Sequence, residues 1–263
     1  MSGTSLIGDV HGHLDTLRGL LRDAGLIDPD GTWTGGESRL WLMGDLCDRG
    51  PDGIGVIDLV MRLQNEARAA GGMVESLLGN HDVLLLAADR FARNRDDRQG
   101  QAFYNGWKRN GGEERDLQWL SSEHVHWLST RPALAIQDDV LLLHADSPLY
   151  LRYGTSIASV NQALAALLQG SDALRWHELL SAFSEHRAFL AASDGEKHAA
   201  DMLRQFGGTR LVHGHSPISN ITRQPPATVL EPLVYAHGLC TDIDGGIYLG
   251  GPGFVYQLER GSP

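Results

Sequence analysis

The chain has 263 residues, 42% of them hydrophobic, and a formal net charge of −11 at pH 7. This length and composition allow a sizeable core and predict one α/β domain over residues 1–263. The acidic balance excludes general affinity for nucleic-acid backbone, which needs a concentrated basic surface, but still allows phosphate binding where metal ions supply positive charge.

The cysteine content and the N-terminal stretch bear on location. Cys47 and Cys240 are too few for a disulfide scaffold and favour a reducing compartment. The opening MSGTSLIGDV has neither a basic flank nor a long apolar run, so it predicts neither a signal peptide nor a membrane span. We expect a cytoplasmic protein without a membrane partner, and no pattern predicts its oligomeric state.

Short apolar runs recur along the chain and end at glycine or at polar residues that can bind ligands. They predict buried strands at residues 5–8, 40–44, 73–79, 140–144 and 210–213. Apolar residues at helical spacing predict helices from Leu14 to Ala24 and from Ile54 to Met61. Because open α/β sheets collect ligands at the carboxyl ends of their strands, we expect the polar residues at these ends to converge.

The remaining segments predict further elements. Residues 89–98 are interpreted as a solvated loop, with an arginine cluster facing substrate as the alternative. Residues 156–206 predict a helical elaboration over one end of the sheets. Strand-like runs around Asp138 and Asp139, and again over 233–258, predict a second, antiparallel sheet. The expected fold is a two-sheet β sandwich flanked by helices.

Five motifs occupy the predicted strand ends. In chain order they are GDVHG (8–12), GDLCDRG (44–50), GNHD (79–82), HAD (144–146) and HGHS (213–216). They combine carboxylates, imidazoles and an amide, a donor set that suits manganese, iron or zinc better than a structural cysteine-type zinc site. Since side chains alternate along a strand, Asp9 and His11 are predicted to point the same way and to share one metal.

Taken together, these motifs resemble the calcineurin-like metallophosphoesterases, most closely the phosphoprotein-phosphatase branch and its bacterial members. CTDIDGGIYLGG is similar to the closing Asp-Thr-Gly-type segment of that family, so the resemblance covers nearly the whole chain. It implies two metal ions bridged by Asp45. The other implied ligands are Asp9 and His11 on one ion, and Asn80, His144 and His215 on the other.

The resemblance also implies the catalytic groups. A hydroxide between the metals would attack phosphorus directly, without a phosphoenzyme. His81 would protonate the leaving group, Asp48 would hydrogen-bond that imidazole, and Arg49 would hold phosphate oxygens. The family usually carries a further phosphate-binding arginine, for which Arg152 and Arg175 are the nearest stand-ins.

Other interpretations stay open for single residues. Asp45 and Asp48 also suit turns, and Asp82 stands where the family commonly has glutamate. His213 lies two residues before His215 and is weighed as an additional ligand. Cys47 is interpreted as a buried filler, with a redox-sensitive thiol as the alternative.

The favoured function is hydrolysis of phosphomonoesters, of the serine/threonine protein phosphatase type, on a phosphorylated protein or small molecule. The alternatives are a dinucleoside polyphosphate hydrolase, a phosphodiesterase and, less favoured, a non-catalytic metal-binding scaffold. No motif names the substrate, because selectivity lies in loops and in the helical elaboration.

Overall fold

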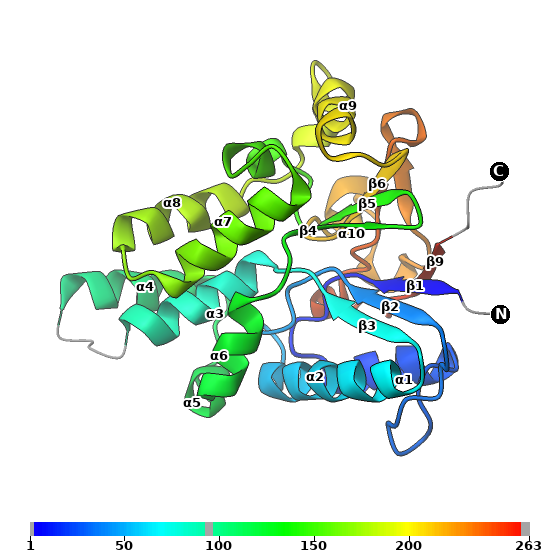
Figure 1. Ribbon diagram of the computed structural model, residues 1–263, viewed down its shortest axis with the longest axis horizontal. Coiled ribbons are helices and arrows are strands. Elements are labelled where there is room, and N and C mark those ends of the chain that lie inside the picture. The colour runs from blue at the N-terminus through cyan, green and yellow to red at the C-terminus, as the bar shows by residue number, and fades with distance from the viewer. Residues whose placement is uncertain (1–2, 93–96, 259–263) are drawn as a thin grey trace.

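The computed structural model describes residues 3–92 and 97–258, which form two β-sheets with helices on their outer faces (Figure 1). In spatial order the first sheet contains β3 (Met73–Ser76), β2 (Arg39–Leu42), β1 (Thr4–Ile7) and β9 (Val255–Leu258). The second contains β4 (Leu134–Gln137), β5 (Val140–Leu143), β6 (Arg210–His213), β8 (Cys240–Asp242) and β7 (Leu233–Tyr235). Strands β1, β2 and β3 are parallel, as are β5, β6 and β8.

One group of helices lies under the first sheet, and most of the other helices lie toward the end opposite the chain termini, whereas α9 (Gly195–Phe206) and α10 (Ile218–Thr222) lie beside the second sheet (Figure 1). The first group is α1 (Leu14–Asp23) and α2 (Gly53–Ala69). The others are α3 (Asn80–Phe91), α4 (Arg98–Arg109), α5 (Glu114–Trp119), α6 (Ser122–Ser129), α7 (Ile157–Gln169), α8 (Ala173–Phe183), α9 (Gly195–Phe206) and α10 (Ile218–Thr222). None of the helices in the described ranges is long and apolar enough to cross a membrane.

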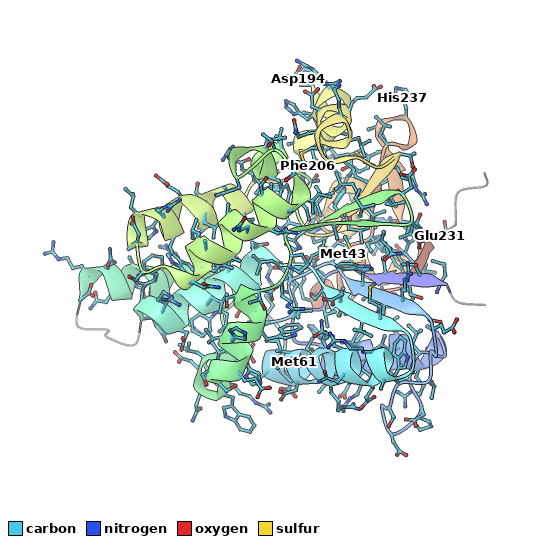
Figure 2. All side chains as sticks on the ribbon, viewed as in Figure 1. Met43, Met61, Asp194, Phe206, Glu231 and His237 are labelled. Atoms are coloured by element: carbon cyan, nitrogen blue, oxygen red, sulfur yellow. The ribbon has the colours of Figure 1, made fainter. Side chains whose placement is uncertain are left out.

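The side chains between the two sheets explain how the layers are held together. Leu6 of β1 and Met43, which directly follows β2, pack in one hydrophobic cluster with Leu142 of β5 and Val212 of β6. Figure 2 shows Met43 between the sheets. The next residue along β1, Ile7, belongs to the other cluster, which includes Leu17 of α1. Side chains alternate along a strand, so neighbouring residues of β1 enter different cores, one between the two sheets and one between a sheet and its helices. This arrangement confirms the predicted sandwich flanked by helices.

The helical elaboration is confirmed, since α7, α8 and α9 lie within 156–206. It packs α7 against β4 and α8 against α3. The hairpin at Asp138 and Asp139 is confirmed too: both residues have positive φ, 49° and 61°, as a two-residue turn between β4 and β5 requires.

Two predictions about segments need correction. The stretch 89–98 is not a loop throughout, because Asp89 to Phe91 complete α3 and Arg98 begins α4; residues 93–96 lie outside the described ranges. The C-terminal segment does not belong wholly to the second sheet, because β9 pairs antiparallel with β1. Period-two patterning shows that a strand forms but not which neighbour it will pair with.

Candidate metal centre

The candidate ligands lie just beyond the strand ends and not on the strands themselves; most of them lie in loops, and Asn80 is the first residue of α3. Strand β1 ends at Ile7, so the alternation argument for Asp9 and His11 was wrong even though their side chains do meet, 3.9 Å apart from Oδ2 to Nε2. Backbone strain is concentrated here, since φ is 46° at His11, 52° at Asp45 and 69° at His215. Non-glycine residues rarely adopt this left-handed region, and such strain persists where the surroundings enforce it, often at functional sites.

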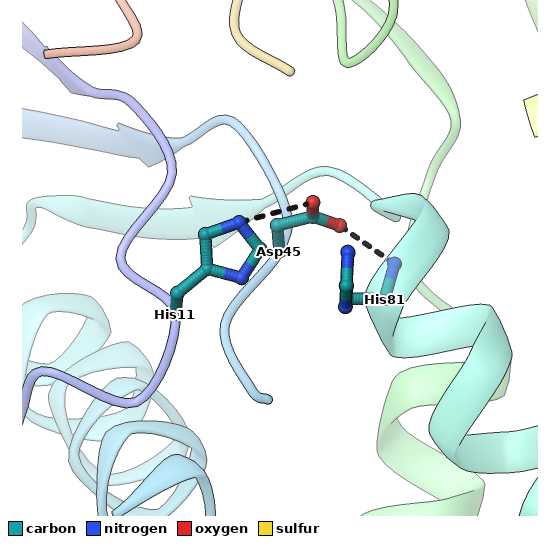
Figure 3. Close-up of side chains that lie close together, drawn as sticks. All are labelled: His11, Asp45 and His81. Atoms are coloured by element: carbon teal, nitrogen blue, oxygen red, sulfur yellow. Dashed lines mark hydrogen bonds and ion pairs between the residues drawn. The ribbon is translucent and has the colours of Figure 1, made fainter. Parts of the chain in front are cut away.

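Asp45 lies at the centre of the group (Figure 3). Its Oδ2 is 3.6 Å from His11 Nε2, and its Oδ1 accepts a hydrogen bond from the backbone N–H of His81 at 2.8 Å and lies 3.4 Å from His144 Nε2. Burial alone would raise the pKa of Asp45, but His144, His81 and other neighbouring imidazoles lower it overall. Asp45 therefore stays ionised at neutral pH with one oxygen toward each side.

Gly44, which precedes Asp45, permits the sharp turn that aims this carboxylate. Its φ is +98°, and a Cβ there would lie 2.6 Å from the backbone nitrogen of Gly79. Glycine is the residue that adopts this backbone conformation and allows this close approach without steric cost.

His144 and Asn80 face each other with atoms that both accept hydrogen bonds. His144 Nδ1–H donates to the carbonyl of Met43 at 2.8 Å, which leaves Nε2 with a lone pair. That Nε2 lies 3.0 Å from Asn80 Oδ1. Two acceptors directed at one point suit a shared cation, and the backbone carbonyl that orients the imidazole is a usual companion of a metal-binding histidine.

His11 is prepared in the same way. Its Nδ1–H donates to the carbonyl of Cys47 at 3.1 Å, so Nε2 is free to accept. Burial lowers the pKa values of His11, His144 and His215, and all three therefore remain neutral at physiological pH. The neutral imidazole is the form that binds metals.

Buried negative charge around Asp9 also fits metal ions. Both carboxylate oxygens of Asp9 accept from the backbone N–H of His215, at 3.0 and 3.1 Å. Burial, followed by the charges of Asp244 and Asp45, raises the pKa of Asp9 well above its ordinary value. Burial likewise raises the pKa of Asp244 to about 7, and its Oδ2 has no hydrogen-bond partner within the described ranges. Bound cations would offset this crowding of carboxylates.

Two groups of side chains could each hold a metal ion, since their ligand atoms lie within 4.8 Å of one another. One group is His11, Asp45 and His81, and the other is Asp45, His144 and His215. Asp45 belongs to both, as a bridging ligand must. The first group contains His81, for which the family resemblance implies acid catalysis, so the role of His81 has to be tested by metal content as well as by activity.

His81 is linked to two residues behind it. Its Nδ1–H donates to Asp48 Oδ2 at 3.0 Å, and Asp48 Oδ1 accepts from the indole Nε1–H of Trp107 at 2.8 Å. His81 is only 1% exposed, and its Nε2 has no hydrogen-bond partner among the residues described. The structure thus brings Asp48 and His81 together, and it adds Trp107, which no sequence motif indicated.

Arg49 lies at the edge of the same group. Its guanidinium donates from Nη1 to His11 Nε2 at 3.0 Å, and its Cζ lies 4.1 Å from the centroid of the Tyr248 ring. The Tyr248 ring also meets the His11 ring edge-on at 4.8 Å. A cation over an aromatic face is held without losing its hydrogen-bond donors. Tyr248 is therefore a second neighbour of the site that sequence reasoning missed, although the segment containing it was noted.

Asp82, the departure from the common glutamate, holds two loops together. Its oxygens accept from the backbone N–H groups of Asp45 at 3.1 Å, Leu46 at 3.0 Å and Gly79 at 2.8 Å. Burial raises its pKa to about 7. The shorter side chain thus ties the GDLCDRG loop to the start of α3. Cys47 is buried beside it, as predicted for a filler, and its thiol contacts Asp82 Oδ1 at 3.7 Å.

Asp116, from α5, is a third residue without a sequence signal. Its carboxylate accepts from the backbone N–H groups of Asp48 at 3.3 Å, Gly53 at 3.0 Å and Ile54 at 3.3 Å. It therefore joins the GDLCDRG loop to the start of α2. Burial raises its pKa to about 6.

Asp116→Asn should change how stability depends on pH. A folded-state pKa of about 6 against an ordinary 3.8 means that the native state favours protonated Asp116, so its contribution is greatest below pH 4 and falls as pH rises to about 6. Wild type should lose about 3 kcal/mol relative to Asp116→Asn between about pH 4 and pH 7. Denaturant unfolding of both proteins across this range measures the difference, and a constant difference would contradict the assignment.

Other residues weighed from the sequence lie differently. His213 Nε2 is 2.7 Å from the hydroxyl of Tyr235, and neither ligand group contains His213, so the weighed ligand role gains no support. Arg152 pairs with Glu185 at 2.6 Å on the surface, and Arg175 is exposed on α8. His186 lies closer to the centre, with its ring 6.0 Å from the ring of His215.

Comparison with known proteins identifies the family. The family model for calcineurin-like phosphoesterases matches residues 5–239. The chain belongs to this family. Calcineurin-like phosphoesterases use a dinuclear metal site, which agrees with the two ligand groups that share Asp45.

Curated relatives of this calcineurin-like phosphoesterase include two kinds of enzyme. The chain is 37% identical over 83 residues to Shewanella-like protein phosphatase 2 of Arabidopsis thaliana, a match that covers 32% of this chain and 21% of that protein. It is 34% identical over 146 residues to the symmetrical bis(5′-nucleosyl)-tetraphosphatase of Pectobacterium carotovorum, covering 54% of this chain and 42% of the relative. These matches span less than half the length of either relative.

Solved structures agree on the fold. The cold-active protein-tyrosine phosphatase of a psychrophilic Shewanella species superposes with a TM-score of 0.75 at 25% identity, covering 99% of this chain and 76% of that one. A protein serine/threonine phosphatase from Saccharomyces cerevisiae gives a TM-score of 0.57 at 14% identity over 100% of this chain and 76% of its own, and indicates the fold alone.

Proposed function

We propose that this chain is a metal-dependent phosphomonoesterase of the serine/threonine protein phosphatase type. The observation that carries the proposal is the hydrogen bonding of the two ring nitrogens of His81. Its Nδ1–H is engaged by Asp48 at 3.0 Å, while its buried Nε2, beside Asp45, has no partner in the described part of the chain. A group that protonates an alkoxide needs this combination, because the carboxylate stabilises the imidazolium and the second nitrogen carries the proton to be given.

The metal ligands in this proposal are the six residues that the motifs indicated, which lie close to one another in the structure: Asp9, His11, Asp45, Asn80, His144 and His215. Two bound ions would supply Lewis acidity and lower the pKa of a coordinated water. The mixed oxygen and nitrogen donors suit manganese, iron or zinc. Arg49, at the edge of the group, would hold the phosphoryl oxygens through its planar fork of donors.

A second activity has a specific observation in its favour. The matches to bis(5′-nucleosyl)-tetraphosphatases extend over 54% of this chain, against 32% for the plant protein phosphatase. Cleavage of a dinucleoside polyphosphate would use the same metals and the same Arg49. A non-catalytic scaffold is less favoured, because all six ligand residues are present.

A substrate panel tests the proposal. With added Mn²⁺ we expect turnover of an aryl phosphate and of phosphoserine or phosphotyrosine peptides, with the activity abolished by EDTA and restored by metal. Faster hydrolysis of a dinucleoside tetraphosphate would favour the second activity, and a cyclic nucleotide reports phosphodiesterase action. No turnover of any substrate, despite bound metal, would favour the scaffold.

The remaining expectations about partners follow from the sequence. The substrate would be a phosphorylated protein or small molecule, and no general nucleic-acid binding is expected at a net charge of −11. The cytoplasmic location stays a prediction.

A further inference from the structure

A residue of α4, outside the strand-end motifs, hydrogen-bonds to the GDLCDRG loop. Trp107, in α4, donates its indole N–H to Asp48 Oδ1 at 2.8 Å, across 59 positions of sequence. The other oxygen of the same carboxylate accepts from His81 at 3.0 Å. Trp107 and Asp48 are both 0% exposed, so bulk water does not compete for these hydrogen bonds.

The segment just after Trp107 forms a backbone hydrogen bond with the GDLCDRG loop. The carbonyl of Gly111 accepts from the backbone N–H of Arg49 at 2.7 Å. Gly112 lies flat against the indole, since a Cβ there would come within 2.2 Å of the ring. Close packing of this kind fixes the indole plane and hence the direction of its N–H. The position of the donor is therefore determined independently of Asp48.

We propose that Trp107 is a positioning residue for proton transfer by His81, acting through Asp48. This inference rests on the proposed phosphatase reaction. A carboxylate held at one oxygen cannot rotate about its Cβ–Cγ bond, so the other oxygen stays directed at His81 Nδ1. That contact in turn keeps His81 Nε2 directed into the centre. Without the indole N–H, Asp48 Oδ1 would be a buried acceptor with no side-chain donor, and the carboxylate would reorient to find one.

Trp107→Phe tests the proposal by removing the N–H while keeping an aromatic ring. We expect kcat for an alkyl phosphate to fall about tenfold, and kcat for an aryl phosphate by no more than about twofold, because only the poor leaving group needs protonation. KM should change little for either substrate. The measurement is kcat and KM for both esters at saturating Mn²⁺, with metal content determined on the same samples.

Trp176→Phe is the matched control. Trp176 is also fully buried and donates its indole N–H, to the carbonyl of Gly170 at 3.1 Å in the α7–α8 turn. If truncating any buried tryptophan lowers activity, both variants should lose the same fraction of activity on the alkyl ester as on the aryl ester. A selective loss on the alkyl ester in Trp107→Phe alone would then belong to Trp107. Thermal unfolding of the two variants compares their stabilities. If Trp107→Phe does not fold, replacing Trp107 by its benzothiophene analogue exchanges the N–H for sulfur at nearly constant shape and should give the same selective loss.

A double-mutant cycle with Asp48→Asn decides whether Trp107 acts through Asp48. In that background Trp107→Phe should add no further selective loss on the alkyl ester. An equal loss on both esters, or a full additional selective loss beside Asp48→Asn, would overturn the inference. If His81→Ala itself shows no selectivity between the esters, the acid role fails; if His81→Ala is selective and Trp107→Phe is not, only the role of Trp107 fails.

Discussion

Asp45→Asn is expected to abolish nearly all phosphatase activity, by about a thousandfold or more, and to remove one or both metal ions. Asp45 is the one side chain common to both candidate ligand groups, with Oδ2 3.6 Å from His11 and Oδ1 3.4 Å from His144. An amide presents only one oxygen and carries no charge, so it cannot draw two cations together. Activity and metal content, the latter by inductively coupled plasma mass spectrometry, are measured on the same purified protein.

Asp58→Asn provides the control for Asp45. It makes the same carboxylate-to-amide change on α2, where Asp58 pairs with His124 at 2.9 Å and its side chain is 63% exposed. Activity and metal content should match wild type there. An Asp45→Asn protein that kept full activity and both metals would end the bridging assignment.

His81→Ala is expected to separate substrates by their leaving groups. Activity on an alkyl phosphate such as a phosphoserine peptide should fall about 10²- to 10⁴-fold, the usual contribution of a general acid, while an aryl phosphate should lose far less. The reason is that phenolates depart without a proton, whereas alkoxides need one. Steady-state kinetics on both esters measure the split.

The metal content of His81→Ala distinguishes two roles for this imidazole. Retention of both ions together with the selective loss supports the acid role, whereas loss of an ion would assign His81 to the ligand group in which it lies with His11 and Asp45. His124→Ala is the matched control, because it removes another His–Asp pair, at the surface of α6. Equal losses on both esters with metal retained would contradict the acid role.

Much of the centre could be anticipated because ligand types stand at the ends of buried apolar runs. The topology of parallel strands brings the ends of β1, β2 and β3 to one edge, and β5 and β6 bring theirs to the facing edge of the second sheet. The motifs after these strands therefore had to meet. Four of the five predicted strand ends were placed one to three residues late, whereas the end of β6 at His213 was placed correctly. An apolar pattern does not reveal where the backbone leaves the ladder.

Residues that act from outside these motifs could not be anticipated. Trp107 and Asp116 belong to helical stretches whose patterns are those of any packed helix, and their contacts to Asp48 span 59 and 68 positions. Tyr248 meets Arg49 only because β9 returns the chain to the first sheet beside β1. Such contacts depend on how distant segments pack and carry no local pattern.

The two aspartates of GDLCDRG show which properties of the site depend on the sequence alone and which depend on the tertiary structure. The sequence by itself determined that carboxylates, imidazoles and an amide would gather at strand ends. The apolar pattern that forms a strand and the polar residues that follow it are local features, and both can be read from the order of residues. Only the tertiary structure decided their surroundings: Asp45 lies beside the imidazoles of His11 and His144, and Asp48 lies between His81 and a buried indole. Burial and long-range hydrogen bonds are set when remote segments exclude water together, and chemically identical side chains acquire different roles from them.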